Sequence, residues 1–142
     1  ERHKAVPSVY LVLRKGDNVL LMLRQNTGYY DHHYALCAGH VEAGELPLDA
    51  LVREAKEEIG VDIQPSDAHI VHTMYRTKRD ETGDRVDIFF EVSKWDGEID
   101  NIERNKCIEI DWFPFDKFPT NMMPHVEIAL THIKNHVRYA EI

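Results

Sequence analysis

Residues 39–61 read GHVEAGELPLDALVREAKEEIGV, and this stretch predicts both a helix and the loop that leads into it. Pro47 stands where the first turn of a helix tolerates a residue without an N–H group. Gly60 follows Ile59, and glycine is the residue that most often ends a helix in the left-handed conformation. The sequence therefore predicts a helix from Pro47 to Ile59.

The side chains of this helix divide into two faces. At 100° per residue, Glu54, Glu57 and Glu58 fall within an arc of about 100°. Apolar residues occupy a neighbouring arc centred about 120° away: Leu48, Leu51, Val52, Ala55 and Ile59. Clustered carboxylates repel one another. Solvent, or the cations Arg53 and Lys56, could offset this repulsion, and a divalent metal such as Mg²⁺ would do so better.

Outside this helix, apolar runs bounded by turn residues predict strands. They fall at 9–14, 19–24, 34–38, 70–77, 85–94 and 107–113. Residues 70–77 and 85–94 are expected to form a hairpin around a turn at 81–84. A terminal amphipathic helix is expected over 126–139, with a buried face made by Ile128, Ala129, Leu130, Ile133 and Val137.

The order of these elements predicts an α/β (α+β) architecture. One helix in mid-chain, another at the end and hairpins between them imply a mixed β-sheet sandwiched between α-helices. The chain contains no repeats and no Gly/Ser-rich linkers, so residues 1–142 are expected to form a single domain.

Composition narrows the class of function. Apolar residues make up 43% of the chain and charged residues 30%, as in a soluble globular protein. The two cysteines, Cys37 and Cys107, do not make a disulfide framework, which predicts a reduced, cytoplasmic protein. The formal net charge of −8 argues against binding to a nucleic acid polymer. No apolar run is long enough to cross a bilayer, so no membrane partner is expected.

The stretch 39–61 matches a known motif at every fixed position. It resembles the Nudix box, which is Gly-x5-Glu-x7-Arg-Glu-U-x-Glu-Glu-x-Gly-U with U an aliphatic residue. The fixed positions are filled by Gly39, Glu45, Arg53, Glu54, Glu57, Glu58 and Gly60, and the aliphatic positions by Ala55 and Val61. At about 1 in 20 per fixed position, a chance match is on the order of one in a billion per starting point. The order of the elements outside the box is similar to the MutT-type Nudix fold.

This resemblance implies a divalent-metal site, with Mg²⁺ expected and Mn²⁺ as the alternative. The implied ligands are the carboxylates of Glu54, Glu57 and Glu58 and the backbone carbonyl of Gly39. A bound metal neutralises the pyrophosphate, lowers the pKa of a water and holds the reacting groups in line. A carboxylate then takes the proton, and Glu54 is the first candidate for this base.

Residues 95–103 resemble the stretch that supplies a further metal-binding acid in MutT. Glu103 is the first choice for that acid and the second candidate for the general base. Glu98 and Asp100 compete with it, and a solvated loop acid is the alternative reading of Glu103.

Two box residues are implied to act through their neighbours. Arg53 is expected to orient the glutamates, and Glu45 is expected to anchor the loop. A plain ion pair that stabilises the loop is the alternative for both. Leu46 stands where a capping Ser or Thr is usual before Pro47, a loss of about 1 kcal/mol at the start of the helix.

Substrate contacts are expected outside the box. Arg24 resembles a phosphate-binding arginine, with a surface ion pair as the alternative. Asn121 resembles the base-reading asparagine of MutT, with a helix N-cap as the alternative. Tyr29, Tyr30 and Tyr34 could stack on a nucleobase or pack within their own loop.

The resemblance implies a reaction, the hydrolysis of a pyrophosphate bond in a small nucleotide-like substrate. The small size of the chain and residues 105–114 are similar to the MutT-like group, whose members convert (deoxy)nucleoside triphosphates to monophosphate and pyrophosphate. Hydrolysis of ADP-ribose or of dinucleoside polyphosphates is the alternative, and Tyr75 keeps the latter open. A Nudix domain that senses nucleotides without cleaving them is the rival from another class, but such domains usually lose box carboxylates. The oligomeric state is left open, with a homodimer among the options.

Overall fold

The computed structural model describes residues 1–78 and 82–142. Of the expected turn at 81–84, Glu81 therefore lies outside the described residues. The elements follow in the order β1 (Ala5–Lys15), β2 (Asn18–Arg24), β3 (Tyr34–Ala35), β4 (Cys37–His40), α1 (Pro47–Ile59), the 3-10 turn η1 (Pro65–Asp67), β5 (His69–Arg76), β6 (Asp84–Val92), β7 (Cys107–Pro114), α2 (Pro124–Lys134) and β8 (Tyr139–Glu141).

The sheet is organised around β1, which pairs with three other strands. It runs parallel to β6, from Ala5 opposite Asp84 to Leu13 opposite Val92. It runs antiparallel to β4, and near its end to β2. Beyond β6 lie β5 and then β8, while β3 and β7 both pair with β2. Parallel and antiparallel pairs in one sheet confirm the predicted mixed sheet, and the antiparallel β5–β6 pair confirms the hairpin.

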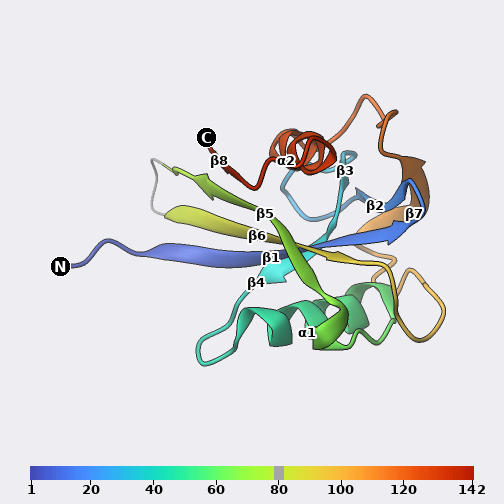
Figure 1. The fold of residues 1–142 in the computed structure, drawn as a ribbon, viewed down its shortest axis with the longest axis horizontal. Coiled ribbons are helices and arrows are strands. Elements are labelled where there is room, and N and C mark those ends of the chain that lie inside the picture. Colours follow the sequence, from blue (N-terminus) through green and yellow to red (C-terminus); the bar gives the residue numbers. More distant parts are fainter. Residues whose placement is uncertain (79–81) are drawn as a thin grey trace.

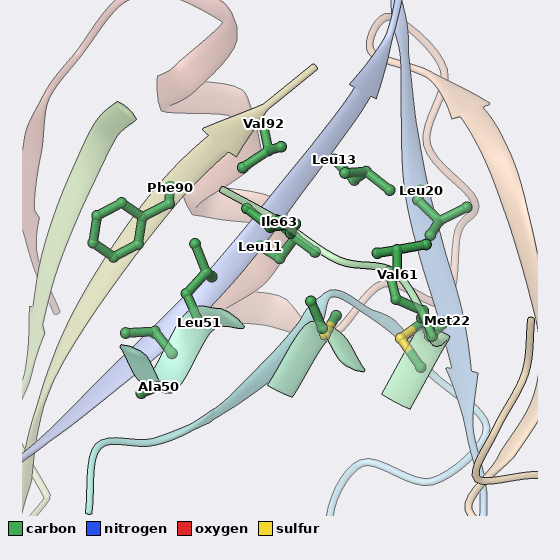
Figure 2. Close-up of a cluster of buried hydrophobic side chains, with 14 of the residues drawn as sticks. Leu11, Leu13, Leu20, Met22, Ala50, Leu51, Val61, Ile63, Phe90 and Val92 are labelled. Carbon is green, nitrogen blue, oxygen red and sulfur yellow. The ribbon is translucent and has the colours of Figure 1, made fainter. Parts of the chain in front are cut away.

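Helices cover both faces of the sheet, with α1 on one side and α2 on the other (Figure 1). Successive side chains of β1 therefore alternate between two apolar cores. Leu11 and Leu13 pack with Leu51 of α1 in the core drawn in Figure 2. Tyr10 and Val12 pack in the other core, where α2 lies. Burial on both faces explains why β1 is apolar at every position from Val9 to Leu13.

The predicted bounds of α1 are confirmed. Leu46 is its N-cap and makes no capping hydrogen bond, as its apolar side chain requires. Gly60 ends the helix with φ 75°. The expected apolar face is turned inward: Ala50, Leu51, Ala55 and Ile59 are buried, and Leu48 and Val52 are packed against the same core. The side of the helix that is not packed against this core carries the acids Glu54, Glu57 and Glu58.

The terminal helix is shorter than predicted. It begins at Pro124 and ends at Lys134, because His136 adopts a left-handed φ of 59° and residues Tyr139–Glu141 pair with β5 as a strand. Its buried face also differs. Ile128 and Val137 are 38% and 40% exposed, and the residues that face the sheet are His125, Val126, Ala129, Leu130 and Ile133.

The single strand expected at 34–38 is divided in two. Its first part, β3, pairs with β2, and its second part, β4, pairs with β1. Leu36 lies between them and is buried. This crossing brings the chain from one strand pair to the other immediately before the loop that enters α1. None of the helices in the described part of the chain is long and apolar enough to cross a membrane.

Candidate active site

Gly39 lies against the side chain of Glu54, which reaches from α1 to β4. A Cβ atom at position 39 would overlap the carboxylate of Glu54, and its three nearest atoms would all belong to that side chain. The backbone of Gly39 is not in the left-handed region, so the requirement for glycine comes from this close approach alone. The first fixed residue of the motif therefore makes room for one of its acids.

Arg53 ties the loop to the helix. Its guanidinium donates two hydrogen bonds to Glu45, at 2.9 Å from Nε and 3.0 Å from Nη2. It also donates to the Glu54 carboxylate at 2.7 Å, to Glu57 at 3.4 Å and to the backbone carbonyl of His40 at 3.2 Å. The contact with Glu45 is the ion pair that stabilises the loop, and the contacts with Glu54 and Glu57 hold those two side chains. Arg53 can therefore stabilise the loop and orient the glutamates at the same time.

These contacts also set the ionisation of the loop acid. The hydrogen bonds from Arg53 lower the pKa of Glu45 to about 2, and a backbone N–H adds to the effect. Glu45 is thus ionised at any physiological pH, and its second partner is the N–H of Glu42 at 3.1 Å. The motif loop is held by a permanent charge pair.

Glu58 points inward rather than toward Arg53. Its Oε2 accepts hydrogen bonds from the N–H of Ala38 at 3.0 Å and from the thiol of Cys37 at 2.9 Å. Burial raises the pKa of Glu58 to about 8, and the nearby charges of Glu54 and Glu103 act in the same direction. Burial likewise raises the pKa of Glu54. Two acids are thus held in a setting that disfavours their ionised forms.

The donor set in this region fits a hard divalent cation such as Mg²⁺. Carboxylate and carbonyl oxygens are its preferred protein ligands, and a cation would stabilise the ionised form that burial disfavours. Within the described residues, no group of three or more His, Cys, Asp or Glu side chains is gathered as a ready-made metal cluster. Glu54 and Glu57 are instead bound to Arg53, and Glu58 to β4. Metal binding would therefore exchange these contacts for coordination.

A cavity of about 590 Å³ opens over these acids, and we call it the acidic cavity. Its charged lining residues are Arg24, Glu42, Arg53, Glu54, Glu57, Glu58, Glu103 and Lys106. The structure thus brings Glu103 to the box glutamates. Asp100 instead forms an ion pair with Arg104 at 3.1 Å and lines a different depression. Glu98 is not among the described residues that line the acidic cavity.

Arg24 lines the acidic cavity at the end of β2. Its guanidinium donates to the carbonyl of Tyr29 at 2.9 Å and to the hydroxyl of Thr27 at 3.0 Å. Among the residues that the structure describes it makes no ion pair, although its charge helps to lower the pKa of Asp31. The phosphate-binding role of Arg24 stays a prediction.

Tyr34 and Asn121 are not brought to the acidic cavity. The hydroxyl of Tyr34 donates to Glu109, which raises the tyrosine pKa to about 12. The side-chain amide of Asn121 donates to the carbonyl of His32 at 2.9 Å. The N-cap of α2 is Met123, so the helix-cap alternative for Asn121 is wrong. In this structure the Asn121 side chain braces the loop that precedes β3, and the Tyr34 side chain links β3 to β7.

A second cavity, of about 510 Å³, was not predicted, and we call it the basic cavity. It shares Arg24, Ala35 and Leu36 with the acidic cavity, so the two adjoin. Its other polar lining residues include Tyr10, Arg76, Lys78, Arg85 and His125. The available sequence signal was Arg76 and Arg85, which lie on either side of the turn of the predicted hairpin. Their neighbours from β1 and α2 are too distant in sequence for spacing to reveal.

A buried network forms one wall of the basic cavity. Arg76 binds the fully buried carboxylate of Asp87 at 2.6 Å. The hydroxyl of Tyr10 lies 3.1 Å from Nε2 of His125 and accepts from Arg76 at 3.5 Å. Burial lowers the pKa of His125 to about 3, and the charges of Arg76, Lys78 and Arg24 act in the same direction. His125 is therefore neutral at physiological pH.

Comparison with known proteins agrees with the motif. A family model described as NUDIX domain matches residues 2–132. An ADP-ribose pyrophosphatase from Methanocaldococcus jannaschii is 28% identical over 123 residues, covering 87% of this chain and 68% of that protein. The NAD-capped RNA hydrolase NudC from Escherichia coli O157:H7 is 25% identical over 113 residues, covering 80% of this chain. The match spans only 40% of the length of NudC.

Solved structures share the fold. A MutT NUDIX hydrolase from Burkholderia pseudomallei superposes with a TM-score of 0.81 at 19% identity, covering 91% of this chain and 98% of that one. A MutT protein from Methanosarcina mazei Go1 superposes with a TM-score of 0.78 at 17% identity, covering 95% and 96%. At such low identity the likeness extends to the fold and not to the substrate.

Proposed function

The chain belongs to the Nudix family of pyrophosphohydrolases, and on that premise we propose that it uses Mg²⁺ to hydrolyse a (deoxy)nucleoside triphosphate to monophosphate and pyrophosphate. Mn²⁺ is the alternative metal. The similarity of the segment 105–114 to the MutT-like group supports this choice of substrate.

One observation carries the proposal. The acids Glu54, Glu57, Glu58 and Glu103 line one cavity, with Arg24 beside them. Glu103 is 45 residues beyond Glu58 in the sequence, so its arrival at the same cavity is a result of the fold and not of the motif. A run of acids that merely solvates a helix face gives no reason for this convergence.

The residues divide the work by position. The metal would be held by four carboxylates and one backbone carbonyl: those of Glu54, Glu57, Glu58 and Glu103, and that of Gly39. When bound, the metal neutralises the charge of the pyrophosphate and lowers the pKa of a water. Arg53 binds Oε1 of Glu54, which leaves Oε2 to take the proton of the attacking water. Arg24 holds the phosphate chain by a charge-assisted contact.

The test is hydrolysis of a nucleotide panel with Mg²⁺, followed by detection of monophosphate and pyrophosphate. The panel contains unmodified and oxidised dNTPs, NTPs, ADP-ribose and diadenosine polyphosphates. Glu58→Gln is expected to lower turnover by about 100-fold or more, since it removes a ligand charge. Glu127→Gln, an exposed acid on α2, is the matched control and is expected to match the unmodified chain. No turnover of any compound would refute the proposal and leave the nucleotide-sensing domain as the better account.

A second candidate substrate is ADP-ribose. It is favoured by the archaeal relative, whose match covers 87% of this chain. Cleavage of ADP-ribose to AMP and ribose phosphate, with triphosphates untouched, would select this candidate and leave the roles of the box residues unchanged.

A further inference from the structure

The two adjoining cavities differ sharply in charge. The acidic cavity has five glutamates among its described lining residues. The basic cavity has four cations, Arg24, Arg76, Lys78 and Arg85, and no carboxylate among the lining residues that the structure describes. The chain as a whole carries a net charge of −8. Four cations around one space are therefore a local exception that attracts anions.

Only one of these cations forms an ion pair with a described residue, although the charge of Arg85 also acts on Asp87 and that of Arg24 on Asp31. Arg76 is paired with Asp87 at 2.6 Å. Arg85 donates to the carbonyls of Thr82 and Gly83, both at 2.6 Å, and these are uncharged acceptors. Lys78 lies 5.7 Å from the ring centre of Tyr29. Within the described part of the chain, neither Arg85 nor Lys78 forms an ion pair through its side chain, and the same holds for Arg24.

The unpaired charges converge on the same wall. Arg24 ends β2, Lys78 follows β5, and Arg85 is near the start of β6, so three separate segments supply them. The charges of Lys78 and Arg24 both act on the buried ring of His125, which lines the cavity. Such convergence costs free energy unless an anion offsets it.

The shape of the basic cavity limits what the anion belongs to. Its volume of about 510 Å³ lies within the ordinary range for a small-molecule site. Arg24, Ala35 and Leu36 are common to both cavities. A ligand whose pyrophosphate lies over the box glutamates would therefore extend across Leu36 into the basic cavity. Such an extension would carry the nucleoside half of the substrate into the basic cavity, and a neutral nucleoside would leave Lys78 and Arg85 without an ion-pair partner among the described residues.

We propose that the basic cavity binds a second phosphate, a monoester on the ribose of the substrate, so that the enzyme selects nucleotides phosphorylated on the sugar as well as at the pyrophosphate. This inference rests on the proposed pyrophosphohydrolase function and narrows its substrate class. Lys78 and Arg85 hold the second phosphate, because a dianion with three oxygens satisfies an ammonium and a guanidinium together. Arg24 stands between the two phosphate positions.

The test compares ligands that differ only in the ribose phosphate. Isothermal titration calorimetry with Mg²⁺ would measure the Kd of AMP, adenosine 2′,5′-bisphosphate and adenosine 3′,5′-bisphosphate, and of the three matching guanosine compounds. In at least one base series a bisphosphate is expected to bind about 10- to 100-fold more tightly than the monophosphate. Lys78→Gln and Arg85→Gln are each expected to reduce this advantage to about threefold or less. Lys134→Gln, an exposed cation at the end of α2, is the matched control and should retain the full advantage.

The outcomes separate this inference from the function on which it rests. A bisphosphate advantage below about twofold in both series, or an advantage that survives both substitutions, overturns the second phosphate site, even if the nucleotide panel is hydrolysed. A clear advantage that depends on Lys78 and Arg85 upholds the site, and absence of turnover on every substrate would then count against the proposed hydrolysis alone. NADPH against NADH, and coenzyme A against its dephosphorylated form, extend the comparison to kcat/KM.

Discussion

Substitution of Gly39 by alanine tests whether the position of Glu54 matters for the reaction. The added methyl group would occupy the space of the Glu54 carboxylate, which must then move by about 1 Å or more to reach ordinary contact. The carboxylate is the far end of a flexible side chain, so we expect a loss of only about 1 kcal/mol of folding free energy, at the low end for overpacking. A displacement of about 1 Å at a reacting group costs on the order of 100-fold in rate.

Gly16→Ala provides the matched comparison. Gly16 lies in the turn between β1 and β2 at φ 61°, and an added Cβ would meet nothing within 4 Å. The strain of a left-handed alanine is expected to cost about 1 kcal/mol as well. The two variants should therefore unfold at similar urea concentrations. Only Gly39→Ala should lose activity.

The assay is kcat/KM for the best substrate of the panel with Mg²⁺, together with urea unfolding followed by tryptophan fluorescence. Glu54→Gln is made in both backgrounds. If Gly39→Ala acts by displacing Glu54, the second substitution should add little to the first, because the two changes remove the same interaction. Activity of Gly39→Ala within about threefold of the unmodified chain would refute the reasoning. Full additivity of the two substitutions would do the same.

Three further predictions concern stability. Because the folded-state pKa of Glu58 is about 8 and its ordinary value is 4.5, the folded chain binds this proton more tightly than the unfolded chain, so metal-free stability is expected to fall as pH rises through this window. Glu58→Gln should remove about 2 kcal/mol of that fall in EDTA, after discounting for partial exposure, and an unchanged pH slope would contradict the assignment. Asp87→Ala leaves the charge of Arg76 buried without a partner and should cost about 3–5 kcal/mol in urea unfolding; a cost below about 1 kcal/mol would mean that water reaches Arg76. Leu130→Ala should cost about 2–5 kcal/mol and Ile128→Ala less than about 1 kcal/mol, and the reverse order would contradict the observed face of α2.

The helix α1 could be predicted to the residue because its signals are local. Pro47 and Gly60 mark its two ends, and its apolar positions follow the helical period without interruption. The end of α2 could not be predicted in this way. Residues 135–142 have helix-compatible composition, but Tyr139–Glu141 gain backbone partners on β5 from more than sixty residues earlier. A partner so distant leaves no trace in a local pattern.

The same contrast applies to the candidate site. The motif acids share one helix, so their mutual arrangement follows from spacing alone. Arg76 reaches Asp87 diagonally across the β5–β6 pair, whose register places Arg76 opposite Arg85, and His125 meets Tyr10 only because α2 covers that face of β1. Tyr34 and Asn121 show the reverse case: both were expected to contact the substrate, while their observed hydrogen bonds join β3 to β7 and hold the loop before β3.

The shared border of the two cavities has a consequence for how such an enzyme can diverge. The acids stand on α1, on the loop that enters it and on the loop before β7, whereas the cations Arg76, Lys78 and Arg85 belong to the β5–β6 hairpin and its flanks. Only Arg24, Ala35 and Leu36 serve both spaces. Mutations in the hairpin can therefore alter substrate preference during evolution without disturbing the catalytic residues. Mutations at Arg24, Ala35 or Leu36 would change both cavities together, so these three positions should vary least among related enzymes.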